Sequence, residues 1–314
     1  MWAYQVSAPG RLSKIEIDAP AEDDLAPGEV ILRLLASGIC GSDIPKFHGH
    51  VKPSDPVIGF PLHELCGEII ASRDPNLTRG MRVVGMARNS NGFSEYVVNP
   101  GSMLRAVESN LTSAMVTMIQ PAATVMNALA RLPDPRDKRV AVIGQGPLGI
   151  LFSHIMKWRG ASHLTGVDRI DRSDVAEKFL IDDTVWKSSD AWAREIAEER
   201  RPEICIEAVG HQPSTLVDAI EACAQDAHIF AFGVPDDTHY AIPFQQLFRK
   251  GLTVTGGVTS DYQRFLLEAQ QYVEANPVMR EAYVTNTMDF ADAQEAFEIY
   301  SRPAAGRLKV VLTS

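Results

Sequence analysis

The second half of the chain alternates between short apolar runs and longer amphipathic stretches. The apolar runs predict buried strands at 139–143, 163–167, 183–186, 203–208, 227–232 and 252–256. Helix-period patterns between them predict helices at 147–159, 171–179, 190–200, 213–224 and 243–250. Because strands that alternate with helices form right-handed βαβ units, this half predicts a doubly wound parallel sheet.

The first 110 residues follow a different pattern, with β-rich runs separated by Pro, Gly and Asp turns. The predicted strands are 2–6, 30–35, 66–71, 82–84 and 93–98. Residues 111–132 then read as helical, and Pro121 predicts a break between two helices. Beyond the second region we expect a helix at 261–275, a short extended piece, a helix at 291–300 and a strand at 308–313.

Six strands already complete a sheet of this kind, so we expect the tail to return to the first domain. The predicted organisation is therefore a mostly-β domain over 1–121, an α/β domain over 122–258, and a C-terminal segment over 259–314 that rejoins the first.

The stretch 140–149, VAVIGQGPLG, joins the first predicted strand of the α/β region to its first helix. Gly144 allows a tight turn, Gly146 lets the backbone approach phosphates, and Gly149 lets the helix pack close to the strand. Pro147 and Leu148 begin the helix, whose N-terminal N–H groups attract anions. This pattern predicts a site for a dinucleotide pyrophosphate.

Asp168 ends the next predicted strand, at roughly the distance where such sites carry an acidic residue. A carboxylate there accepts hydrogen bonds from the adenosine ribose and repels a 2′-phosphate, which favours NAD over NADP. Arg169 and Arg172 follow closely, and either could pair with a phosphate. NADP therefore stays open as an alternative.

Composition narrows the possible partners. The formal net charge is −10, which argues against nucleic acid or an anionic membrane as a partner. We find neither an 18-residue apolar run nor an export signal. The four cysteines fit no disulfide framework, so we expect a cytoplasmic protein; they are Cys40, Cys66, Cys205 and Cys223.

The first domain holds three residues able to bind a metal: Cys40 in GICGSD, and His63 with Glu64 in GFPLHELCGE. A thiolate, an imidazole and a carboxylate suit a catalytic zinc, which has three protein ligands and an open position. Their separation along the chain forms no compact ligand motif, and each residue alone is ordinary. The spacing by itself therefore leaves the site undecided.

Taken together, the motifs resemble those of the zinc-containing medium-chain dehydrogenase/reductase family, which includes alcohol, polyol and threonine dehydrogenases. The resemblance runs the length of the chain: PGEVILRL, GICGSD, HELCG, GFSEYVV, GQGPLG, IEAVG and GRLKVVL occur in the family's order. It implies a Rossmann sheet inserted into a mostly-β GroES-like catalytic domain, and zinc-assisted hydride transfer between an alcohol and NAD.

Carried over position by position, the resemblance implies that Cys40 and His63 are zinc ligands and that Glu64 is a neighbouring carboxylate ligand. Ser42 matches the hydroxyl that passes on the substrate's proton, and Asp43 matches a residue that orients a ligand. It also implies that Val209 and Gly233, after the fourth and fifth strands of the α/β domain, approach the nicotinamide.

The chain departs from the family pattern in three places. Gln120 stands where many members have a glutamate near the metal, so either Glu64 or a water linked to Gln120 would complete the zinc shell. Pro45 replaces a proton-relay histidine, for which His48 and His50 are the candidate substitutes. Residues 87–92 replace the cysteine-rich lobe, so we expect one catalytic zinc per chain and no structural zinc.

The leading hypothesis is a zinc-assisted, NAD-dependent dehydrogenase that interconverts a secondary alcohol, polyol, amino alcohol or cyclitol with its ketone. One alternative is a zinc-free NADPH-dependent quinone or enoyl reductase of the same superfamily. The other is a non-catalytic nucleotide-binding protein on this fold. The resemblance also implies a homodimer or homotetramer, in which the strand at 252–256 pairs with its twin.

Overall fold

The computed structural model describes residues 1–50 and 57–314 and contains two compact units. Unit 1 comprises residues 1–123, 262–303 and 307–314, and unit 2 comprises residues 124–261 and 304–306. Helix α3 (Ile119–Leu129) crosses the boundary. Within the described residues, no helix is long and apolar enough to span a membrane.

Unit 1 is mostly β-sheet. A two-stranded sheet pairs β1 with β2, and a seven-stranded sheet has the order β14-β15-β3-β4-β5-β7, with β6 also paired to β3. The strands are β1 (Trp2–Ala8), β2 (Arg11–Glu16), β3 (Glu29–Gly38), β4 (Glu64–Ser72), β5 (Arg82–Met86), β6 (Tyr96–Pro100), β7 (Leu104–Ala106), β14 (Val284–Asp289) and β15 (Lys309–Thr313).

The helices of unit 1 are α1 (Asp43–Phe47), α2 (Ser113–Val116), α8 (Leu266–Ala275), α9 (Pro277–Tyr283) and α10 (Ala293–Ser301). One apolar cluster joins β3, β4 and β15 to α10. In it, Phe93 stacks on Tyr4 with ring centroids 4.4 Å apart, and Phe297 packs on Phe47 at 5.0 Å. The C-terminal strand β15 pairs antiparallel with β3, so the tail contributes to the same sheet as the N-terminal region.

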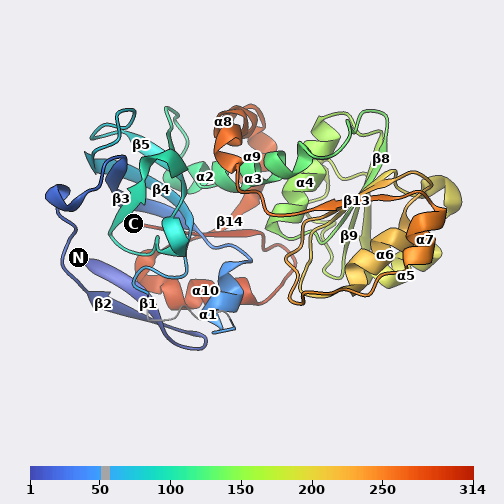
Figure 1. The fold of residues 1–314 in the computed structure, drawn as a ribbon, viewed down its shortest axis with the longest axis horizontal. Helices are drawn as coiled ribbons and strands as arrows, with labels where there is room; N and C mark the ends of the chain where they lie inside the picture. The colour runs from blue at the N-terminus through green and yellow to red at the C-terminus, as the bar shows by residue number, and fades with distance from the viewer. Residues whose placement is uncertain (51–56) are drawn as a thin grey trace. The chain divides into compact units, whose positions relative to one another are not determined.

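Unit 2 is a doubly wound α/β layer structure. Its six-stranded parallel sheet has the order β10-β9-β8-β11-β12-β13, with α4 on one face and α5, α6 and α7 on the other (Figure 1). The strands are β8 (Arg139–Ile143), β9 (His163–Asp168), β10 (Asp183–Trp186), β11 (Ile204–Glu207), β12 (His228–Ala231) and β13 (Thr253–Gly256). The helices are α4 (Pro147–Trp158), α5 (Ser189–Glu195), α6 (Ser214–Ala222) and α7 (Phe244–Arg249).

The six predicted strands of this region are confirmed, but the predicted helix at 171–179 is wrong. Only a 3₁₀ turn forms there, at Glu177–Phe179. The carboxylate of Asp171 accepts hydrogen bonds from the Ser173 backbone N–H at 2.9 Å and its hydroxyl at 2.6 Å. Such local side-chain bonds compete with helix formation, and Leu180 in the left-handed region (φ 56°) ends the turn.

Other predicted boundaries shift. The helix predicted at 190–200 ends at Glu195, because Ile196 is extended. The break near Pro121 falls before the proline, which occupies the first turn of α3, where no backbone donor is needed. The extended piece expected after 275 is α9 followed by β14.

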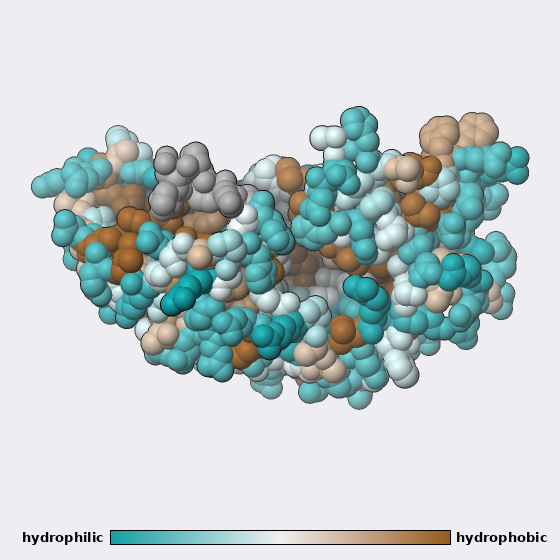
Figure 2. Space-filling view, turned by 90° about the horizontal axis from the view of Figure 1, so that it is seen from below, coloured by the Kyte–Doolittle hydropathy of each residue, from teal (hydrophilic) through white to brown (hydrophobic). Residues whose placement is uncertain are grey.

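The face drawn in Figure 2 is mostly polar, with separate apolar groups. Among the exposed apolar side chains are Phe244 and Phe248 of α7, which are 66% and 74% exposed. The neighbouring β13 is an edge strand of the sheet, as the predicted pairing between subunits would require. The homo-oligomer itself stays a prediction.

Candidate metal and dinucleotide sites

Cys40, His63 and Glu64 form a cluster in unit 1. Cys40 lies just beyond the end of β3, and Glu64 begins β4, whose antiparallel pairing places it opposite Gly38. One ligand atom from each of the three residues lies within 4.8 Å of the others. All three side chains are largely buried. Among the residues that the structure describes, these are the ones brought together as a possible metal site.

Asp43 fixes the orientation of this cluster. Its Oδ1 lies 2.7 Å from His63 Nδ1, and its Oδ2 accepts a 2.9 Å bond from the Cys40 backbone N–H. With Nδ1 bonded, the other ring nitrogen of His63 remains for a metal. Burial opposes protonation of His63, but Asp43 and Cys40 outweigh it, so the pKa of His63 is raised well above its usual value. Asp43 therefore has the orienting position that the resemblance implies.

Sequence reasoning missed Lys309, the first residue of β15. Its Nζ lies 2.5 Å from Glu64 Oε2, and both side chains are only 1% exposed. Gly38 makes room for this pair, because a Cβ there would overlap Glu64 Oε2 and lie 2.6 Å from Lys309 Cε. The available signal was a lysine flanked by Leu308 and Val310 in a predicted strand, since a buried lysine needs a partner.

Three other residues were predicted for this site: Ser42, His48 and Gln120. Ser42 is exposed and precedes α1. His48 directly follows α1 and packs on Phe47 with ring centroids 5.0 Å apart. Gln120 is buried in the first turn of α3, in the same unit as the cluster. Their proposed roles stay predictions.

The cluster fits a zinc ion by its chemistry. Cys40, His63 and Glu64 would offer a sulfur, a nitrogen and an oxygen donor, which is the number of protein ligands that a catalytic zinc uses. The Asp43–His63 bond is the outer support that metal-binding histidines usually have.

The predicted dinucleotide turn has the expected form in unit 2. Gly144 has φ +90°, and α4 begins after Gly146 with Pro147 and Leu148 as its first residues. A Cβ at Gly149 would collide with the Gly144 carbonyl oxygen, whereas a Cβ at Gly146 would meet nothing within 4 Å. The third glycine thus permits close strand–helix packing, and the second leaves open space beside the helix N-terminus, which fits a pyrophosphate.

Asp168 ends β9, and its carboxylate is fixed by the backbone. Oδ2 accepts from the Gln145 N–H at 2.7 Å and Oδ1 accepts from the Ile170 N–H at 2.9 Å. The acidic group is therefore tied directly to the glycine turn. Arg169 is exposed, whereas Arg172 is 4% exposed and its Nη1 donates to the Ala304 carbonyl at 2.8 Å.

The loops after β11 and β12 are held together by Glu207, which sequence reasoning did not single out. Its Oε1 accepts from the N–H groups of Val209 and Gly210, both at 2.9 Å. Its backbone oxygen accepts from the Gly233 N–H at 3.0 Å. Val209 is 38% exposed. Both loops leave the carboxyl ends of parallel strands, where ligands bind in sheets of this kind.

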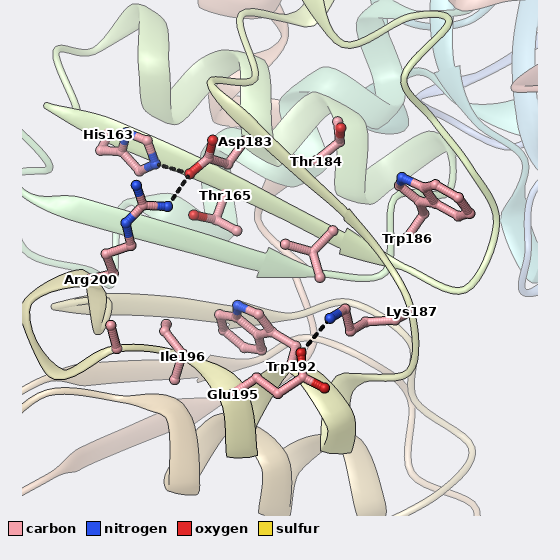
Figure 3. Close-up of a pocket in the computed structure, with 12 residues that line it drawn as sticks. His163, Thr165, Asp183, Thr184, Trp186, Lys187, Trp192, Glu195, Ile196 and Arg200 are labelled. Carbon is pink, nitrogen blue, oxygen red and sulfur yellow. Dashed lines mark hydrogen bonds and ion pairs between the residues drawn. The ribbon is translucent and has the colours of Figure 1, made fainter.

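A separate open cavity of about 690 Å³ lies on the flank of the same sheet (Figure 3). At one end Asp183 bonds His163 and Arg200, and at the other Lys187 pairs with Glu195. The cavity follows β10 from Asp183 to its last residue, Trp186, and the residues that line it do not include those of the glycine turn.

Comparisons with known proteins cover nearly the whole chain. Residues 26–109 match the family model for the alcohol dehydrogenase GroES-like domain, and residues 116–313 match the model for the glucose dehydrogenase C-terminus. Both parts of the predicted fold, the Rossmann sheet and the GroES-like domain, are thereby confirmed.

Among the relatives is starvation-sensing protein RspB of Escherichia coli, with 24% identity over 100% of this chain and 99% of that protein. D-arabinitol dehydrogenase 1 of Uromyces fabae is 23% identical over 95% and 93% of the respective chains. The solved galactitol-1-phosphate dehydrogenase of Escherichia coli superposes with a TM-score of 0.86 at 22% identity, over 100% of both chains. The chain belongs to the zinc-type medium-chain dehydrogenase family.

Proposed function

We propose that the protein is a zinc-assisted, NAD-dependent dehydrogenase that oxidises a secondary alcohol group of a polyol or a related alcohol, or reduces the corresponding ketone. The single observation that carries the proposal is the convergence of Cys40, His63 and Glu64 within 4.8 Å. Family membership supports an oxidoreductase. Polyol dehydrogenases are prominent among the relatives, including D-arabinitol and D-altritol dehydrogenases.

Each part of the chain has a defined task in this proposal. Zinc, when bound, acts as a Lewis acid on the substrate oxygen. Cys40, His63 and Glu64 would hold it, and Asp43 orients His63 and the Cys40 backbone. Ser42 is exposed and follows Cys40 by two residues. It is proposed to move the substrate's proton outward.

The glycine turn and Asp168 would hold the nicotinamide cofactor, which accepts or supplies the hydride. Support comes from the open space at Gly146 and from the fixed carboxylate of Asp168. A solved RspB structure, 24% identical to this chain, is described as complexed with NADH. Arg172 is already bonded to Ala304, which favours NAD over NADP.

Metal analysis combined with a substrate screen tests the proposal. The protein, purified without chelator, should hold about one zinc per chain. It should change NADH absorbance with at least one alcohol or ketone from a panel of polyols, amino alcohols and cyclitols. A zinc-free protein that reduces quinones or enoyl compounds with NADPH would instead identify the alternative reductase. Binding of NADH without turnover or zinc would identify a non-catalytic protein.

Replacing Asp168 with asparagine tests the cofactor preference. The amide keeps an oxygen acceptor but removes the charge that repels a 2′-phosphate, so the ratio of NADP to NAD dissociation constants should fall by roughly tenfold. Titration of both reduced cofactors by fluorescence measures the ratio. Asp171→Asn, three residues away and bonded to Ser173, is the matched control and should leave it unchanged. An unchanged ratio in Asp168→Asn would remove the basis for the NAD assignment.

A further inference from the structure

The phenol of Tyr283 is a buried polar group of unit 1. Tyr283 ends α9, and its side chain is 0% exposed. Its hydroxyl has no hydrogen-bond partner among residues 1–50 and 57–314. Burying a hydroxyl without a partner costs free energy, and phenylalanine would fill the same space without that cost. The hydroxyl therefore calls for a functional explanation.

The strand order of unit 1 brings this phenol to the end of the sheet that carries the metal cluster. Val284, the next residue, lies opposite Lys309 in the parallel pair β14–β15. β15 lies between β14 and β3, and the end of β3 at Gly38 lies opposite Glu64. Four neighbouring strands thus bring Tyr283 close to the Lys309–Glu64 pair.

Electrostatics identify the possible acceptors. Burial raises the pKa of Tyr283 well above its usual value, and the acidic groups of Glu64 and Cys40 raise it further. A phenol is protonated at neutral pH and can donate a hydrogen bond. The other two ionisable neighbours, Tyr300 and Tyr272, are themselves phenols. A carboxylate is the stronger acceptor among these groups.

We infer that Tyr283 is a positioning residue of the metal centre, whose hydroxyl donates to the Glu64 carboxylate when Glu64 serves as a metal ligand. The inference rests on the proposed function. A carboxylate that gives one oxygen to a metal is itself held by hydrogen bonds, and removing such outer partners typically weakens metal binding by 10–100-fold. Lys309 supplies one bond to this carboxylate, and Tyr283 supplies the second.

Tyr283→Phe tests the inference by metal affinity. The dissociation constants for Zn²⁺ and Co²⁺, measured by competition with a chelator, should rise by about tenfold. The visible absorption spectrum of the Co²⁺ protein should shift, because the carboxylate changes its position. Tyr272→Phe, which removes another buried phenol of the same unit, is the matched control and should retain both properties. The inference is wrong if Tyr283→Phe binds Co²⁺ as the natural chain does, with the same spectrum, or if both variants weaken equally.

A second comparison links the phenol to Glu64 itself. In a Glu64→Gln background, Tyr283→Phe should cause little further loss of affinity, because the acceptor carboxylate is already gone. If the losses of metal affinity in the two single variants simply add in the double variant, the phenol does not act through Glu64, and the inference is wrong. If the natural chain binds neither metal, the proposed function fails instead. Circular dichroism of each variant in chelator verifies that it is folded.

Discussion

A Cys40→Ala variant should lose its zinc and its dehydrogenase activity while it continues to bind NADH. Cys40 contributes the only sulfur donor in the cluster with His63 and Glu64. Loss of a Lewis acid worth several kcal/mol lowers turnover by roughly a thousandfold or more. The glycine turn belongs to the other compact unit, so NADH affinity should be unchanged.

Metal content, turnover and NADH fluorescence measure the three parts of this prediction. Cys66→Ala is the matched control, because Cys66 is also buried in unit 1 and lies outside the cluster. Burial raises the pKa of the Cys66 thiol to about 12, so it stays protonated and is a poor metal ligand. Cys66→Ala should keep zinc and activity. Normal turnover by Cys40→Ala would show that the assigned chemistry is wrong.

The second large effect is expected on stability, from Lys309→Met. The substitution removes the ammonium group that pairs with the Glu64 carboxylate. That carboxylate stays buried, since only 1% of its side chain is exposed. Breaking one side of a buried ion pair typically lowers the free energy of unfolding by about 3–5 kcal/mol. Urea unfolding followed by circular dichroism, in chelator so that metal binding does not contribute, measures the loss.

A double variant separates loss of the charge pair from loss of packing. Lys309→Met combined with Glu64→Gln removes both charges, and replacing both partners is far less costly than removing one. The double variant should therefore recover much of the lost stability. If the single and double variants unfold at the same urea concentration, the ion pair is not what stabilises this part of the sheet.

Local patterns were sufficient to predict the glycine turn. The turn at Gly144, Gly146 and Gly149 follows from the backbone freedom of glycine and from close strand–helix packing, both of which are local. The helix expected at 171–179 failed for a reason that is also local. Asp171 satisfies the backbone of Ser173, and the apolar periodicity does not include that competing bond.

The sequence predicted the chemistry of the cluster of Cys40, His63 and Glu64 only in part. The residue types of Cys40, His63 and Glu64 indicated zinc, and the resemblance pointed to a supporting role for Asp43, which is bonded to His63. Lys309 was overlooked because a lysine within an apolar strand has meaning only once its partner is known. Tyr283 carries no sequence signal at all, since a buried tyrosine usually serves the core.

The sequence by itself thus determined the alternation that builds the parallel sheet and the glycine turn, because these depend on residues close together in the chain. It also supplied the donor types of Cys40, His63 and Glu64, but not their convergence. Only the tertiary structure decided which distant residues meet. The order β14-β15-β3-β4 brings the C-terminal Lys309 to Glu64. Strand pairing across the sheet fixes that contact, and local periodicity contains no information about it.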